Sequence, residues 1–92
     1  MYNITDYSYK QADKLGVYIA PATNKKFKID IFDRDYQYIT SIGSKSYSDY
    51  PTYILSHGKE YADERRRLYK LRHSKDRDIE FSRGWFADKI LW

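Results

Sequence analysis

The chain has 92 residues, no cysteine and a formal net charge of +4. This length leaves room for one domain over residues 1–92, and the lack of cysteine excludes disulfides, thiolate nucleophiles and cysteine-based zinc sites. No stretch is long and apolar enough to span a membrane, and the first residues lack the order of a signal peptide. We therefore expect an intracellular protein that is not secreted and has no membrane partner.

A short helix followed by a strand is predicted at the start of the chain. Ser8 stands three residues before a glutamine, which is the spacing of a helix-capping box. The helix should therefore run over residues 9–15 and end at Gly16, which can adopt the left-handed conformation. Residues 17–20 then predict a short strand that Pro21 stops.

A β-hairpin is predicted next. Apolar and polar residues alternate over residues 27–31, the two-residue period of a half-buried strand. Residues 33–35 predict a polar turn, and residues 36–42 a second strand rich in tyrosine and β-branched side chains. The hairpin and the strand at 17–20 together predict a small antiparallel sheet.

The second half of the chain is predicted to be helical. Asp49 can cap a short helix that has Pro51 in its first turn, residues 53–55 on its buried side and Gly58 at its end. A longer helix is predicted over residues 59–74. Its apolar stripe has spacings of three, four and seven, and consists of Tyr61, Ala62, Leu68 and Tyr69.

The last part of the chain predicts a charged connector over residues 76–80 and a final helix capped by Ser82. Trp85, Phe86 and Ile90 should point inward from that helix. The chain ends on apolar residues, and we expect this end to dock into the domain's own core rather than to insert into a partner. The exposure of Trp92 tests that expectation.

These elements together predict an α+β fold. It should consist of a small antiparallel sheet of two to three strands, an N-terminal helix, and two to three C-terminal helices packed on one face. Residues 1–43 would supply the first helix and the sheet, and residues 44–92 the helical, basic and tyrosine-rich part. Both belong to one domain, since no linker or internal repeat divides them.

The strongest functional candidate is a basic segment on the long predicted helix. Residues 65–75 contain six lysines and arginines, one histidine and no acid. Adjoining basic rows flanked by tyrosines suit phosphate contact combined with ring stacking on bases. The predicted nucleic-acid-binding residues are Arg65, Arg66, Lys70, Arg72, His73 and Lys75, with Tyr47 and Tyr50 as stacking partners.

A structural interpretation of the same residues stays open beside the functional one. Asp63 stands three and four residues before Arg66 and Arg67, so part of the charge can be used in ion pairs along the helix. Basic residues also favour the C-terminal ends of helices because of the helix dipole. Tyr53 is expected in the core, whereas the sequence leaves open whether Tyr47 and Tyr50 are exposed or packed.

The sequence gives little support to catalysis or metal binding. The two histidines, His57 and His73, form no nucleophile–base–orienter set, and the scattered glycines form no phosphate-binding loop. Asp30, Asp33 and Asp35 cluster near the predicted turn but lack the glycine and the final glutamate of a calcium loop. We therefore expect no enzyme activity, no metal, no cofactor and no small-molecule substrate.

Three ordered blocks of the second half carry a resemblance to a known family. They are Ser41-Ile42-Gly43 with Tyr47-Ser48-Asp49-Tyr50-Pro51, then Arg65-Arg66 through Tyr69 and Arg72-His73 to Lys75-Asp76, and finally Ser82-x-Gly84 through Leu91-Trp92. This pattern resembles a family of short proteins that are encoded by large DNA viruses of algae and amoebae and by some tailed phages. The resemblance implies a viral origin and assigns no role to any residue.

Two functions from different classes follow from these observations. The first is a non-enzymatic, virus-encoded protein that associates with nucleic acid through the basic helix. The second is a structural or adaptor protein, such as a minor virion component or a binder of a host or viral protein. Tyrosine and arginine are enriched at both kinds of interface, so the sequence does not separate the two. Either protein would act in the infected host cell or within the virion.

Overall fold

The computed structural model describes residues 2–92 and has an α+β fold, as predicted. A three-stranded antiparallel sheet has the order β1-β2-β3. Within the described residues the elements in chain order are α1 (Asp6–Leu15), β1 (Tyr18–Pro21), β2 (Phe27–Phe32), β3 (Tyr38–Ser44), α2 (Tyr50–His57), α3 (Lys59–Arg72), the 3₁₀ helix η1 (Asp76–Asp78) and α4 (Arg83–Ile90).

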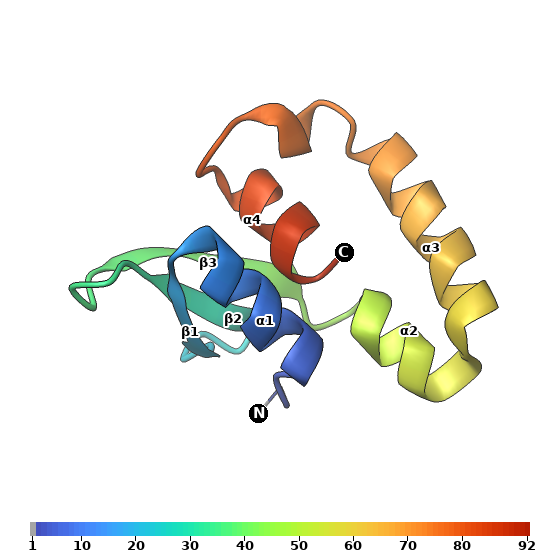
Figure 1. The fold of residues 1–92 in the computed structure, drawn as a ribbon, viewed down its shortest axis with the longest axis horizontal. Coiled ribbons are helices and arrows are strands. Elements are labelled where there is room, and N and C mark those ends of the chain that lie inside the picture. The colour runs from blue at the N-terminus through green and yellow to red at the C-terminus, as the bar shows by residue number, and fades with distance from the viewer. Residues whose placement is uncertain (1) are drawn as a thin grey trace.

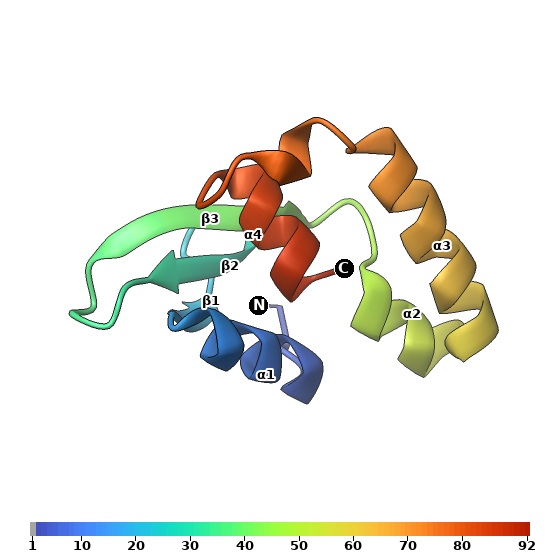
Figure 2. The ribbon, with the colours of Figure 1, turned by 45° about the horizontal axis from the view of Figure 1, so that its top comes forward.

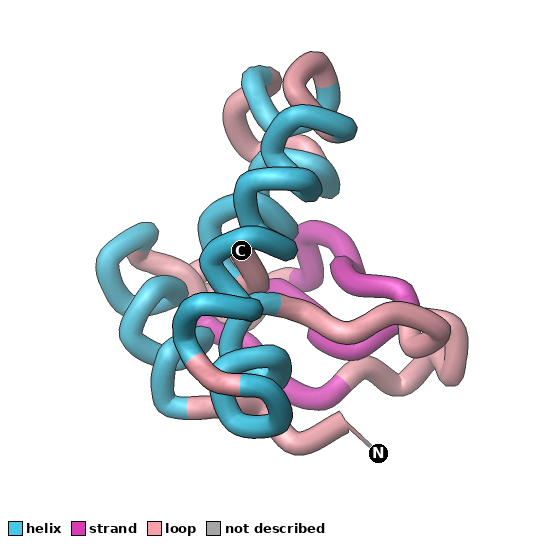
Figure 3. Tube along the Cα trace, turned by 90° about the vertical axis from the view of Figure 1, so that its right-hand side faces the viewer, coloured by secondary structure: helices cyan, strands magenta, loops and turns pink. Residues whose placement is uncertain are grey.

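The helices have two different relations to the sheet. Helices α1 and α4 lie over one face of the sheet (Figure 1). In the side view of Figure 3, the strands, in magenta, lie to one side of the helices, in cyan. Helices α2 and α3 form a helical hairpin beyond the end of the sheet, on the other side of α4 from the strands (Figure 2). This hairpin packs on the rest of the domain chiefly through its inner side, which leaves its outer side uncovered.

Helix α1 begins one turn earlier than predicted. The Thr5 side chain caps it by accepting a hydrogen bond from the Ser8 backbone N–H at 3.4 Å, so the prediction of Ser8 as the cap was wrong. The Ser8 hydroxyl is instead buried and donates to the Ile90 carbonyl at 2.9 Å. Gly16 ends the helix in the left-handed conformation, as predicted. The hydroxyl of Ser8 is therefore engaged with Ile90, and Thr5, three residues earlier, caps the helix in its place.

The sheet confirms the three predicted strands and shifts most of their ends by one or two residues. Pro21 belongs to β1, where it pairs with Ile29, because an edge strand tolerates the missing N–H of proline. Tyr36 lies in the turn with a φ of +63° rather than in β3. The Asp33 carboxylate holds this turn by accepting from the backbone N–H groups of Asp35 and Gln37, both at 2.9 Å.

The hydrophobic core lies between the sheet and helices α1 and α4. It is formed by Ala12, Val17, Ile29, Ile31, Ile42, Phe86, Ile90 and Leu91. Leu91 is 1% exposed, and the Trp92 ring stacks on Tyr69 with ring centroids 4.3 Å apart. The end of the chain thus docks into the domain, which confirms the sequence-based expectation.

The helical hairpin is less buried than its sequence predicts. Helix α2 ends at Gly58, as predicted, but Leu55 is 80% exposed instead of facing the core. In α3, Ala62 and Tyr69 are buried, whereas Tyr61 and Leu68 of the predicted stripe are exposed. Helix α3 is covered along one narrow side only. The predicted stripe spreads over about a third of the helix circumference, which is too wide for that side to bury completely.

Gly43 is the glycine at which a side chain would be most damaging. Its φ is +79°, and a Cβ atom there would lie 2.7 Å from Leu91 Cδ1, whereas Gly16, with a φ of +74°, faces open space. We expect Gly43→Ala to lower the free energy of unfolding by about 2–3 kcal/mol and Gly16→Ala by about 1–2 kcal/mol. Urea unfolding compares them, and equal losses would show that crowding against Leu91 has no effect.

Candidate functional site

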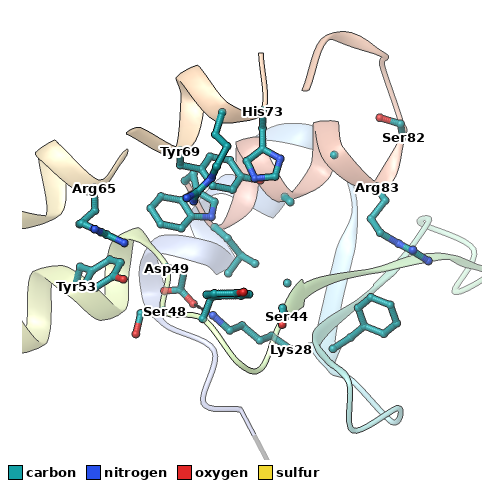
Figure 4. Close-up of a pocket in the computed structure, with 18 of the residues that line it drawn as sticks. Lys28, Ser44, Ser48, Asp49, Tyr53, Arg65, Tyr69, His73, Ser82 and Arg83 are labelled. Carbon is teal, nitrogen blue, oxygen red and sulfur yellow. Dashed lines mark hydrogen bonds and ion pairs between the residues drawn. The ribbon is translucent and has the colours of Figure 1, made fainter. Parts of the chain in front are cut away.

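A groove runs between the end of the sheet, helix α3 and the start of α4, with a cavity volume of about 960 Å³ (Figure 4). Its lining combines positive charge with aromatic rings. The cationic residues are Lys26, Lys28, Arg65, Arg72 and Arg83, together with His73. The aromatic residues are Phe27, Tyr47, Tyr53, Tyr69 and Trp92. Asp49 is the one acid in this lining among the residues that the structure describes.

Helix α3 forms one wall of the groove. Figure 4 shows Arg65, Tyr69 and His73 projecting from it toward the cavity. The Arg65 guanidinium lies 5.5 Å from the centre of the Tyr53 ring, and His73 stacks on Tyr69 at a centroid distance of 4.3 Å. Arg72 is exposed and makes no ion pair within residues 2–92. Its charge is therefore available to an anion.

The opposite wall comes from the start of β2 and the start of α4. The Arg83 guanidinium lies 4.8 Å from the centre of the Phe27 ring, and Lys26 is exposed just before β2. Ser82 caps α4 by accepting from the Trp85 backbone N–H, which places Arg83 in the first turn of the helix. Figure 4 shows Arg83 on the far side of the cavity from the α3 residues, with its side chain directed away from α3. Cations thus stand on both sides of an aromatic interior.

A buried ion pair lies at the floor of the groove. The Lys28 ammonium is 2.9 Å from the Asp49 carboxylate, and their side chains are 6% and 1% exposed. The Tyr2 hydroxyl donates to the same carboxylate at 2.7 Å, and the backbone N–H of Thr52 donates to it at 3.0 Å because Asp49 caps α2. Lys28 and Asp49 therefore neutralise each other, and the net charge of the groove comes from its rim.

The Tyr2 hydroxyl makes stability sensitive to alkaline pH. Burial and the hydrogen bond to Asp49 raise the pKa of Tyr2 above its usual value of 10.0. Above pH 10 the unfolded chain loses this proton before the folded chain, so the free energy of unfolding should fall as pH rises, by at most about 1.4 kcal/mol per pH unit. In urea unfolding between pH 10 and 12, Tyr2→Phe should show a shallower decline, and an unchanged slope would contradict this role.

Two of the predicted nucleic-acid-binding residues instead hold the helical hairpin in place. The Arg66 guanidinium lies 3.8 Å from the centre of the Tyr50 ring and 3.7 Å from the Asp63 carboxylate. The Lys70 ammonium lies 2.7 Å from Asp88, which is almost completely buried in α4. Neither cation lines the groove. Both cations therefore have partners within the domain, and their assignment to phosphate contact stays a prediction.

The remaining predicted residues divide between the groove and other places. Tyr50 is 4% exposed, with its hydroxyl donating to Asp63 at 2.7 Å, so burial removes it as a stacking partner for bases. Lys75 is exposed but lies outside the groove lining, whereas Tyr47 is 74% exposed and belongs to it. The groove therefore brings together four of the predicted residues, namely Arg65, Arg72, His73 and Tyr47.

Sequence reasoning missed the cations of the opposite wall. Lys26 follows another lysine in a loop, and Arg83 follows the predicted cap of the last helix. Both positions look like ordinary solvated surface in the sequence, because their neighbours in the groove are far away along the chain. Arg83 lies within the last family-like block, to which the resemblance assigns no role, so no local signal identifies this wall.

The acidic residues near the hairpin turn have structural partners. Asp30 is buried in β2 and accepts hydrogen bonds from the Ser41 hydroxyl and the Thr23 backbone N–H. Asp33 closes the turn, as described above. Among the described residues 2–92, no three histidine or carboxylate side chains stand close enough together to hold a metal ion.

Comparisons with known proteins leave the resemblance to viral proteins as a prediction. No protein-family model, no curated protein and no solved structure matches the chain. No helix within the described residues has the length and apolar character needed to cross a membrane. The groove therefore has to be interpreted from its own chemistry.

Proposed function

We propose that this protein is a non-enzymatic binder of single-stranded nucleic acid and that the strand lies in the groove between α3 and α4. One observation carries the proposal: cations on both walls surround an aromatic interior in which Asp49, the one acid among the described lining residues, is already neutralised. Phosphates attract such cations whatever the base sequence, and unpaired bases stack on aromatic rings.

The geometry favours a single strand over a duplex. Phe27, Tyr47 and Trp92 line a concave space, so a base must leave its helical stack to reach them. A duplex keeps its bases stacked inside and offers its phosphates on a convex surface, which suits a flat or protruding basic surface better than a groove. Arg65, Arg72 and Arg83 at the two walls would then contact the backbone of the strand.

Fluorescence anisotropy with labelled single-stranded and duplex oligonucleotides of one sequence tests this proposal. We expect tighter binding of the single strand, with log Kd depending on log salt at a slope of about 0.7 per contacted phosphate. The double variant Arg65→Glu with Arg72→Glu should weaken binding by about tenfold or more, because two groove cations become anions.

The matched control is Arg67→Glu on the same helix. Arg67 is paired with Glu64 at 2.6 Å and does not line the groove. Arg67→Glu therefore changes the net charge as much as either single substitution in the groove does, but leaves the groove itself intact. We expect less than about twofold weakening for this control. The proposal would be refuted if Arg67→Glu weakened binding as much as each reversed charge of the groove variant does. Binding that did not depend on salt would refute it as well.

A structural or adaptor role is the second proposal, and the exposed tyrosines favour it. Tyr36, Tyr38 and Tyr47 are 73%, 56% and 74% exposed, more than a domain needs for its own packing. Tyrosine is enriched at protein interfaces because its ring packs while its hydroxyl stays hydrated. A pull-down from infected cells with and without nuclease separates the two roles, since recovery of a partner that survives nuclease supports the adaptor role.

A further inference from the structure

An aromatic row crosses the three strands at the end of the sheet nearest the turn between β2 and β3. In the register of the sheet, Tyr18 of β1 pairs with Phe32 of β2, and Phe32 pairs with Tyr38 of β3. The Phe32 and Tyr38 rings pack edge to face with centroids 6.1 Å apart. Tyr36, in the turn, stacks on Tyr18 at a centroid distance of 4.9 Å. These four side chains therefore form one continuous row of rings.

The aromatic row lies on the face of the sheet that helices α1 and α4 leave open. Ile31, the strand neighbour of Phe32, is buried in the core, and successive side chains of a strand point to opposite faces. Three rings of the row are exposed, Tyr18 by 37%, Tyr36 by 73% and Tyr38 by 56%. Exposed aromatic rings that contact one another are typical of a binding surface, unlike apolar residues scattered singly.

The hairpin that carries the aromatic row is acidic, although the whole chain has a net charge of +4. Residues 29–44 contain three aspartates and one arginine. The Arg34 guanidinium lies 3.4 Å from the Asp13 carboxylate of α1, so its charge is already balanced. Asp35 is exposed beside Tyr36 and makes no ion pair within residues 2–92. Open rings thus stand next to uncompensated negative charge.

The guanidinium group of arginine fits this combination, because it stacks on aromatic rings and pairs with carboxylates. The protein shows the same contact internally, since the Arg34 guanidinium lies 4.5 Å from the centre of the Tyr18 ring. The aspartates would repel phosphates, which argues against nucleic acid on this surface. Figures 1 and 2 also show the turn at the end of the molecule opposite α3, away from the α3 wall of the groove.

We propose that the aromatic row docks an arginine-rich segment of a partner protein, with guanidinium groups stacked on Tyr36 and Tyr38 and paired with Asp35. This inference rests on the second proposed role, that of an adaptor, and names the chemistry of its partner. Exposed stacking contacts and ion pairs are individually weak, so the affinity should require several arginines and fall with salt. The groove and the aromatic row are separate surfaces, so both can be occupied at once.

Fluorescence anisotropy with a labelled peptide of alternating glycine and arginine tests this proposal. We expect saturable binding that weakens as salt is added. Replacing every arginine by citrulline keeps the shape of the side chain without its charge and should abolish binding. Replacing arginine by lysine should weaken binding by about threefold or more, because an ammonium lacks the flat face that stacks on a ring.

Two pairs of variants locate the peptide on the aromatic row. Tyr36→Gly should weaken peptide binding by about threefold or more, whereas Tyr36→Phe keeps the ring and should bind as the wild type does. Tyr36 has a φ of +63°, which glycine adopts without a steric penalty, so Tyr36→Gly should stay folded. Asp35→Asn should weaken binding by about twofold or more, and Glu60→Gln, the matched loss of an exposed acid on α3, should have no effect.

Several results would overturn the proposal. They are the absence of saturable binding, equal binding of the citrulline peptide, and equal weakening by Asp35→Asn and Glu60→Gln. The single-strand affinity of Tyr36→Gly should stay unchanged because Tyr36 does not line the groove, and a parallel loss would contradict two separate surfaces. A nuclease-resistant partner that bound Tyr36→Gly as well as the wild type would leave the adaptor role standing but exclude the aromatic row as its site.

Discussion

Asp49→Ala is expected to lower the free energy of unfolding by about 3–5 kcal/mol, the largest effect of any single change proposed for this protein. The substitution leaves the Lys28 ammonium buried at 6% exposure, with the Tyr2 ring 5.4 Å away as its remaining contact. It also removes the cap of α2, which contributes about 1 kcal/mol. Urea unfolding monitored by circular dichroism measures the loss.

Two further variants separate the charge from the cap. Asp49→Asn keeps a capping side chain and removes the charge, so it should be less damaging than Asp49→Ala by about 1 kcal/mol. Lys28→Met combined with Asp49→Asn removes both charges and should recover most of the loss, because no uncompensated ammonium remains. If Asp49→Ala costs only about 1 kcal/mol, Asp49 acts as a cap and the ion pair contributes nothing.

The elements that sequence predicts well are those that local rules determine. The caps of α2 and α4, Asp49 and Ser82, have side chains that bond the backbone three residues on, within one short segment. Gly16 and Gly58 end their helices because each has a positive φ, which glycine adopts without a steric penalty. In β2 the alternation predicted the strand correctly but not its burial, because Lys28 and Asp30 on the second face are buried as well.

The cations of α3 show what local rules cannot supply. Helical spacing correctly places Arg66 and Lys70 on the same row of α3, one turn apart, but it does not reveal what faces that row. Their partners are Tyr50, on the preceding helix, and Asp88, on α4. A basic residue next to a buried carboxylate is used structurally, whereas the same residue type one row away lines a groove.

The groove forms only in the folded tertiary structure. Lys26, Arg65 and Arg83 come from a loop, the middle of α3 and the start of α4, and only the fold brings them around one cavity. The sequence predicted the composition of the site, cations with aromatic rings, and four of its residues, Arg65, Arg72, His73 and Tyr47. It could not supply the opposite wall, because long-range proximity leaves no mark in residue spacing.

Two substitutions on α3 should produce opposite phenotypes, which tests this division of its cations. Lys70→Met should lower the free energy of unfolding by about 2–3 kcal/mol, because Asp88 is 2% exposed and keeps only Lys89 at 3.9 Å. The loss is below that expected at Asp49 because Lys70 is itself 34% exposed. The Kd for single-stranded nucleic acid, measured where the protein is folded, should stay unchanged.

Arg72→Met should behave in the reverse way. Arg72 has no ion pair within residues 2–92, so its removal should change stability by less than about 0.5 kcal/mol. Single-strand affinity should fall, and the slope of log Kd against log salt should decrease by about 0.7, the value of one lost phosphate contact. Both variants remove one positive charge from the same helix, so a loss that depended on net charge alone would be equal in the two. We expect instead that Lys70→Met loses stability and Arg72→Met loses affinity, because the two cations lie on different sides of α3.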